Sequence, residues 1–178
     1  MSIQIRSEPP VDLRARVAHH EAGHAVVARA LHFEIGGASI VTEEDSAGRV
    51  INRWSEALLA ALENEDLSIQ QAVEAIQVFR AGRAAEERFL GSGREVTWGV
   101  DGSEDDDRRA LVLANRAAPV DGFALMAFGG ELTKTLVAFQ WTAITRLAEL
   151  LLEHDVVTAD EIDAIMHESE PWAPDSVT

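Results

Sequence analysis

Cysteine is absent from this chain of 178 residues. Disulfide bonds and thiolate metal ligands are therefore excluded, and any metal ion must be held by histidine and carboxylate groups. Lysine is almost absent, because Lys134 is the only one. Thr133 rather than glycine precedes it, which excludes the Gly-Lys-Thr loop that binds phosphate in many ATPases.

Long apolar runs are also missing, since no run approaches the roughly 18 residues that span a bilayer. Residues 1–10 have no basic start followed by an apolar core, so the sequence predicts neither a signal peptide nor a membrane span. We therefore expect a cytoplasmic protein. The net charge of −16 repels phosphate backbones, so nucleic acid is not expected as a partner.

The length and the hydrophobic content of 47% predict a single folded domain over residues 1–178. Its core is expected at about 11–168, with loose tails at 1–10 and 169–178. The fold class is mainly α (α+β), with a small β-hairpin after the first helix. Helices are expected at 12–33, 54–62, 68–90, 103–117, 131–153 and 158–167. Strands are expected at 38–42 and 49–52, joined by an acidic turn at 43–48. Residues 119–130 are expected to form a loop, with room for one helical turn.

The most informative motif is the pentapeptide His20-Glu21-Ala22-Gly23-His24. Residues four apart lie on the same face of a helix, so His20 and His24 can hold one zinc ion from one side. Glu21 then lies beside a water molecule at the metal. This His-Glu-x-x-His pattern is typical of zinc hydrolases, in which the glutamate is the general base.

A catalytic zinc ion takes three protein ligands, and the residues alone leave the third one open. His32 points about 80° away from His24 around the helix and lies further along it, so it is a poor ligand. Glu86 could bind metal or pair with Arg83 on its own helix. The acids 105–107 could bind metal or form a solvated helix start, which the helix dipole favours.

Four blocks of the sequence resemble the peptidase domain of the FtsH-type, AAA-linked zinc metalloproteases. The resemblance covers about residues 11–168. The blocks are residues 18–27 with the His-Glu-Ala-Gly-His motif, the strand at Ser39-Ile40, the segment Ala81-Gly82-Arg83-Ala84-Ala85-Glu86 followed by Gly91, and the segment Gly102-Ser103-Glu104-Asp105-Asp106 with Ala110 and Ala114 behind it.

The resemblance implies a helical peptidase domain with one Zn²⁺ per chain, held by His20, His24 and Asp106. It aligns Asp106, rather than its neighbours, with the third ligand of the family, and it gives Glu21 the role of general base. Secondary candidates for the site are Asp105, Glu86 and His19. His19 stands where the family has an aromatic residue, and we expect it to support a ligand or to lie in the core.

The implied activity is zinc-dependent hydrolysis of peptide bonds in flexible or unfolded polypeptides, independent of ATP in itself. The alternative is a zinc-binding interaction or regulatory domain without catalysis. The family joins this domain to an ATPase and to membrane spans, and this sequence shows neither, so a free-standing domain is expected. The expected partners are a polypeptide substrate and either a separate ATPase or a dedicated protein partner. The oligomeric state stays open.

Overall fold

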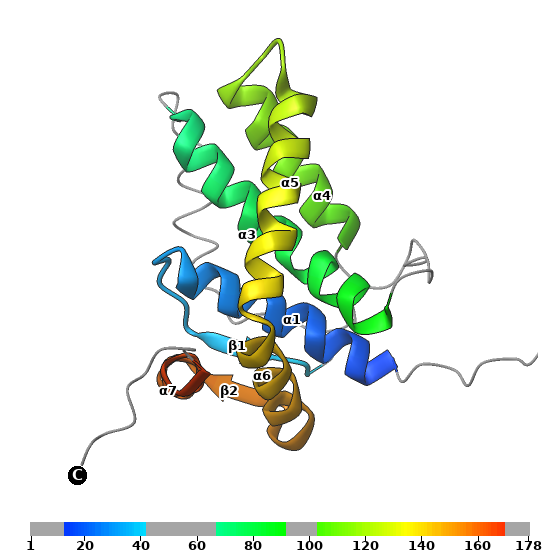
Figure 1. The fold of residues 1–178 in the computed structure, drawn as a ribbon, viewed down its shortest axis with the longest axis vertical. Helices are drawn as coiled ribbons and strands as arrows, with labels where there is room; N and C mark the ends of the chain where they lie inside the picture. The colour runs from blue at the N-terminus through cyan, green and yellow to red at the C-terminus, as the bar shows by residue number, and fades with distance from the viewer. Residues whose placement is uncertain (1–12, 42–66, 92–102, 170–178) are drawn as a thin grey trace, which may run out of the picture.

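The structure is a computed structural model that describes residues 13–41, 67–91 and 103–169. Within these ranges the chain forms six helices and one antiparallel sheet of two strands (Figure 1). This confirms the predicted fold class, mainly α with a small sheet. None of the helices in the described ranges is both long and apolar enough to cross a membrane.

The elements follow one another as α1 (Leu13–Ala30), β1 (Gly37–Ser39), α3 (Ile69–Leu90), α4 (Ser103–Ala117), α5 (Gly122–Phe139), α6 (Trp141–His154), β2 (Val156–Thr158) and α7 (Ala159–Ser169). Capping boxes are present at the starts of α3 and α7. Ser68 and Gln71 exchange hydrogen bonds at the start of α3, and Thr158 and Glu161 do so at the start of α7.

Helix α1 ends at Ala30 rather than at Phe33 as predicted. His32 has a left-handed φ of 64°, and its N–H donates to the carbonyl of Arg29. The N–H of Phe33 reaches back to the carbonyl of Ala28, which completes a Schellman-type C-terminus. The helix is therefore closed at His32, a residue other than glycine.

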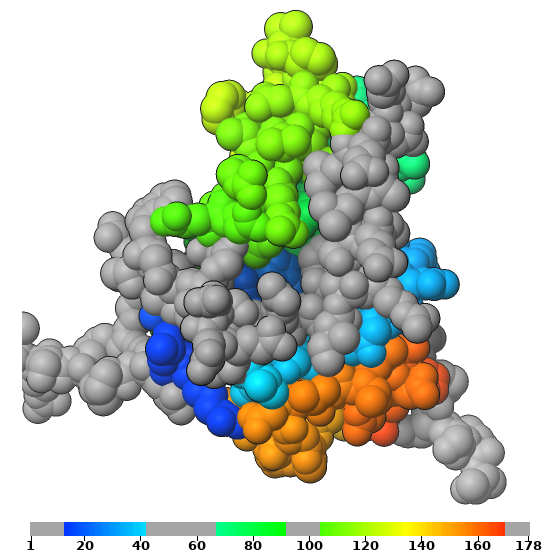
Figure 2. Space-filling view, turned by 180° about the vertical axis from the view of Figure 1, so that it is seen from behind, coloured from blue at the N-terminus to red at the C-terminus, as the bar shows by residue number. Residues whose placement is uncertain are grey.

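The small sheet pairs β1, in the first part of the described chain, with β2, close to its end. Strand β1 lies within the predicted strand 38–42 except at Gly37, and it pairs antiparallel with β2, with Ala38 opposite Val157. In Figure 2 the cyan surface of the β1 region lies beside the orange surface of the β2 region. Strand β2 was not predicted from the sequence. The predicted partner strand 49–52, the turn 43–48 and the helix 54–62 lie outside the described residues.

The predicted loop at 119–130 is wrong, because α5 begins at Gly122. Gly129 lies inside this helix and is buried. A Cβ atom at Gly129 would lie 2.6 Å from Cγ2 of Ile76 on α3. Glycine therefore permits a close approach of the two helices.

The predicted single helix 131–153 is divided at Gln140, where φ is −89° and ψ is 12°. Hydrogen bonds still bridge the break, from the N–H of Gln140 to Leu136 and from the N–H of Ile144 to Gln140. The division lets α5 pack against α3 and α6 pack against α1. Tertiary packing thus divides a sequence whose helical period is uninterrupted.

Helix α3 is the centre of the molecule, because it packs against α1, α4 and α5. Its largest fully buried side chains are Ile76, Val78 and Phe79. Small residues of α1, including Ala22 and Ala25, are completely buried in the same core. Helix α3 therefore fixes α1 and α4 relative to each other, and these two helices carry the candidate ligands.

Candidate metal centre

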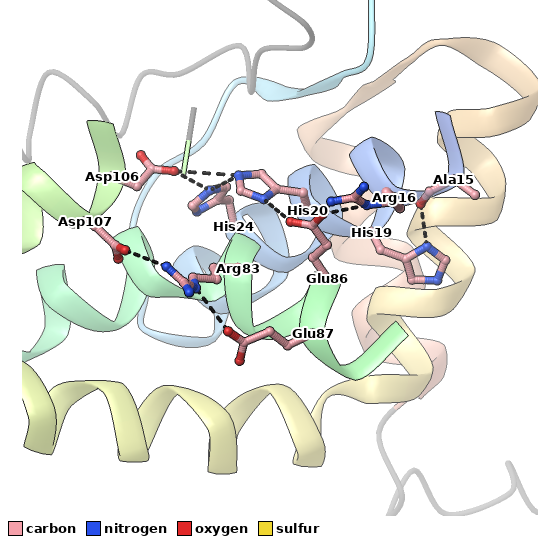
Figure 3. Close-up of polar contacts among 10 residues, drawn as sticks. All are labelled: Ala15, Arg16, His19, His20, His24, Arg83, Glu86, Glu87, Asp106 and Asp107. Carbon is pink, nitrogen blue, oxygen red and sulfur yellow. Dashed lines mark hydrogen bonds and ion pairs between the residues drawn. The ribbon is translucent and has the colours of Figure 1, made fainter. Parts of the chain in front are cut away.

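Three predicted ligands come together from two helices (Figure 3). His20 and His24 lie one turn apart on α1, and Asp106 reaches them from the first turn of α4. Both imidazoles are buried, whereas the side chain of Asp106 keeps 19% of its surface exposed. The cluster therefore lies in a largely dry setting and is reached by solvent on its carboxylate side.

The distances within the cluster suit a tetrahedral ion. Nε2 of His24 lies 3.1 Å from Nε2 of His20 and 3.1 Å from Oδ2 of Asp106. Nε2 of His20 lies 3.6 Å from the same carboxylate oxygen. Two ligands of a tetrahedral zinc ion, each bonded at about 2.0–2.1 Å, are about 3.3 Å apart. The three atoms suit three of the four positions around such an ion.

The backbone of α3 orients His24. Its Nδ1 lies 2.7 Å from the carbonyl oxygen of Val78, and a carbonyl can only accept a hydrogen bond. Nδ1 therefore carries a proton, and Nε2 is the nitrogen of His24 that could bind a metal ion. Metal-binding histidines typically have such a partner on the second ring nitrogen.

Glu86 is the corresponding partner of His20. Its Oε2 lies 3.7 Å from Nδ1 of His20, on the side of the ring that faces away from Asp106 (Figure 3). Its Oε1 accepts hydrogen bonds from Nε of Arg16, at 2.7 Å, and from Nη2 of the same residue. Arg83, the alternative partner of Glu86 on its own helix, pairs with Glu87 and Asp107. Glu86 thus supports a candidate ligand and stays outside the ligand cluster.

Gly82 of α3 lies directly beside the two imidazoles of the cluster. A Cβ atom at this position would lie 2.4 Å from Nε2 of His24 and 2.6 Å from Nε2 of His20. Any side chain would therefore occupy the space between the two imidazoles. The structure keeps this space open at the point where a metal ion would be bound.

Charges within the cluster shift the pKa values of its members. Burial acts to lower the pKa of His20, but the carboxylates of Asp106 and Glu86 outweigh burial and raise it to about 10. Burial acts to raise the pKa of Asp106, but His24 and His20 hold it well below its usual range. Without a metal ion the cluster retains a proton between imidazole and carboxylate. A divalent cation would replace that proton and meet the same carboxylate.

The other candidates lie outside this cluster. Asp105 pairs with Arg108 and Arg109 of its own helix. His19 points to the opposite side of α1, where its Nδ1 lies 2.8 Å from the carbonyl oxygen of Ala15 (Figure 3). Its ring stacks on Phe89 at 4.0 Å between centroids. His19 is therefore a packing residue of the core.

Glu21 is buried with 7% of its surface exposed, and it directly follows His20 on α1. Its charge contributes to the raised pKa of His20, after burial and the contacts with Asp106 and Glu86. A carboxylate so close to the cluster can exchange a proton with a group bound there.

Four groups that shape the site were not given their roles from the sequence: the carbonyl of Val78 and Arg16 were not named, and Gly82 and Asp107 were named only within longer segments. One of them left a signal. A glycine in the middle of a long helix costs about 1 kcal/mol relative to alanine, so Gly82 indicates a close approach. The others depend on which helices are neighbours, and local sequence does not carry this information.

Two imidazoles and a carboxylate, with a glutamate after the first histidine, define a helical His-Glu-x-x-His site that could hold one divalent metal ion. Models of protein families give no match to this chain. The chain is similar to the ATP-dependent zinc metalloprotease FtsH 1 of Sorangium cellulosum (strain So ce56), with 36% identity over 101 residues. The aligned part is 56% of this chain and spans 15% of the relative. This partial similarity points to an FtsH-related peptidase.

Proposed function

We propose that this chain is a zinc-dependent metallopeptidase that hydrolyses peptide bonds in flexible or unfolded polypeptides. The observation that carries the proposal is the convergence of His20, His24 and Asp106 at distances that suit one tetrahedral ion. The supports on both imidazoles and the open space above Gly82 agree with it. The similarity to a zinc metalloprotease points to the same chemistry.

The residues of the site have three proposed roles, which are metal binding, proton transfer and support of the ligands. His20, His24 and Asp106 hold the zinc ion, which supplies Lewis-acid chemistry that activates water and polarises a carbonyl group. Glu21 takes a proton from the attacking water and later gives it to the leaving nitrogen. Val78 keeps His24 in the tautomer that presents Nε2 to the ion, and the carboxylate of Glu86 lies beside Nδ1 of His20.

The substrate is proposed to lie extended along β1, which follows the ligand helix α1 directly among the elements described. Strand β1 pairs with β2 on one side, and an extended polypeptide can add to the other edge of such a strand. Hydrolysis at this site needs no nucleotide. Folded substrates would be supplied by a separate ATPase or a dedicated protein partner.

Metal content and peptide cleavage test the proposal together. Elemental mass spectrometry of untagged protein should find about one zinc per chain. The Asp106→Ala variant should lose most of this zinc, and the matched control Asp105→Ala should keep it. Cleavage of an unfolded, fluorescently labelled polypeptide should fall by about 10²-fold or more in Glu21→Gln, with zinc retained.

The possible results test the general base, the metal centre and the catalytic activity separately. Cleavage that survives Glu21→Gln contradicts the assigned base. Protein that takes up no zinc contradicts the metal centre. One zinc per chain, without cleavage of any unfolded substrate, would establish the alternative, a zinc-binding interaction domain without catalysis.

A further inference from the structure

The metal centre is asymmetric, because α1 supplies two candidate ligands and α4 supplies one. His20 and His24 share one helix, and each has its own support. Helix α4 packs mainly against α3 and α5. Asp106 therefore reaches the imidazoles only while the first turn of α4 keeps its place on α3.

Asp107 joins that first turn to α3 by two charged hydrogen bonds. Its Oδ1 accepts from Nη1 of Arg80 at 2.9 Å, and its Oδ2 accepts from Nη1 of Arg83 at 2.9 Å. The two arginines lie three residues apart on α3, so they grip the carboxylate from adjacent turns. The Asp107 side chain is only 18% exposed, which limits screening by water.

Apolar packing alone fixes the position of α4 less firmly. Among the described residues of α4, those that are fully buried are Ala110, Leu113 and Ala114. Two of the three are alanines, whose methyl groups form shallow ridges that resist rotation and sliding only weakly. A carboxylate held at both oxygens resists these movements directly.

We propose that Asp107 is a positioning residue of the metal centre. The Arg80–Asp107–Arg83 clamp holds the first turn of α4 on α3, and this places Oδ2 of Asp106 within reach of both imidazoles. Figure 3 shows the two neighbouring carboxylates pointing apart, Asp106 to the histidines and Asp107 to Arg83. The inference rests on the proposed function, since it assumes that the cluster binds a metal.

The chain provides a matched control in Asp105. Asp105→Asn and Asp107→Asn remove the same charge from the same helical turn, and each changes a residue next to Asp106. Asp105 contacts only arginines of its own helix among the described partners. In competition with a chromophoric chelator, Asp107→Asn should weaken zinc binding by about tenfold or more, and Asp105→Asn by less than about twofold.

Two further measurements separate positioning from simple stabilisation. Cobalt(II) absorption of the folded protein should lose its tetrahedral character in Asp107→Asn and keep it in Asp105→Asn, which a loss of stability alone would not produce. Asp107 acts through Asp106, so Asp107→Asn should weaken metal binding little in an Asp106→Ala background. Additive losses in the double variant contradict positioning.

Arg80→Gln keeps the test decisive if Asp107→Asn does not fold. This variant removes one arm of the clamp and leaves Arg83 in place, so zinc binding should weaken to an intermediate degree. If Asp107→Asn and Arg80→Gln bind zinc as tightly as the parent protein and give the same cobalt spectrum, the clamp is overturned and the proposed function stays intact. Parent protein that takes up no zinc overturns both.

Discussion

Nδ1 of His24 lies 2.7 Å from the carbonyl oxygen of Val78, so the backbone of α3 sets the tautomer of a candidate ligand on α1. Substitution of the Val78 side chain leaves this support in place, because the acceptor belongs to the main chain. Helix α3 also contributes Gly82 and Glu86 to the surroundings of the site. The two candidate ligand histidines therefore depend on α3, which contributes none of the three candidate ligands.

Gly82→Ala should abolish zinc binding while the helices persist. The added methyl group would lie 2.4 Å and 2.6 Å from the Nε2 atoms of His24 and His20, so the imidazoles must separate. Alanine favours a helix by about 1 kcal/mol over glycine, so α3 itself is not weakened. Zinc titration with circular dichroism checks both points. Gly130→Ala is the control, because its nearest neighbours, atoms of Arg80, lie 4.0 Å from the added carbon. Equal zinc affinity in the two variants would contradict the role of Gly82.

Glu86→Gln should weaken zinc binding by about tenfold or more and should also lower stability. The change removes the carboxylate beside Nδ1 of His20 and leaves Arg16, whose side chain is 14% exposed, without its charged partner. Glu87→Gln is the matched control on the same turn, because Glu87 pairs with Arg83 and is more exposed. Zinc competition and urea unfolding measure the two effects. Identical behaviour of both variants would show that Glu86 gives no support to His20.

Metal-free protein should be most stable between about pH 5 and pH 6.5. The pKa values of Asp106 and Glu86 are lowered, so their stabilisation is present above the ordinary carboxyl range and is lost as the pH falls through it. The pKa of His20 is raised to about 10, so its stabilisation is complete below its unfolded value and is lost as the pH rises towards 10. Urea unfolding with a chelator checks this curve, and Asp106→Asn should flatten it. A free energy of unfolding that stays level from pH 6 to pH 10 would refute the coupling.

His19→Phe should leave zinc content and affinity unchanged. Burial lowers the pKa of His19, and its ring stacks on Phe89 and Trp141, so an aromatic hydrocarbon suits the position. The hydrogen bond to Ala15 lies within one helix, and we expect its loss to shift the melting temperature by only a few degrees, corresponding to about 1 kcal/mol. Zinc analysis and thermal unfolding test this together. Loss of zinc in this variant would place His19 in the metal centre.

Local sequence patterns predicted the features that depend only on residues close together in the sequence. The four-residue spacing of His20 and His24 puts both on one face of α1, and the capping residues Ser68 and Thr158 mark where α3 and α7 begin. The choice of Asp106 came from a family resemblance, because spacing alone does not separate three adjacent acids. In the structure Asp106 reaches the histidines of α1, Asp107 pairs with arginines of α3, and Asp105 pairs with arginines of its own helix.

Features that depend on contacts between residues far apart in the sequence were not predicted. Strand β2 is a run of only three residues, and its identity as a strand depends on β1, which lies far away in the sequence. Gly129 resembles a loop signal until Ile76 is known to lie against it. The break at Gln140 has no local cause, since α5 and α6 turn towards different partners.

A metal ion held by α1 and α4 would be a cross-link between segments that are far apart in the chain. His24 and Asp106 are 82 residues apart, and α3 lies between them in the sequence. An ion that binds all three ligands therefore binds only the folded chain, and mass action then shifts the folding equilibrium towards that state. The same ion would act as a reporter of folding, because a chain with α4 detached from α3 would release it.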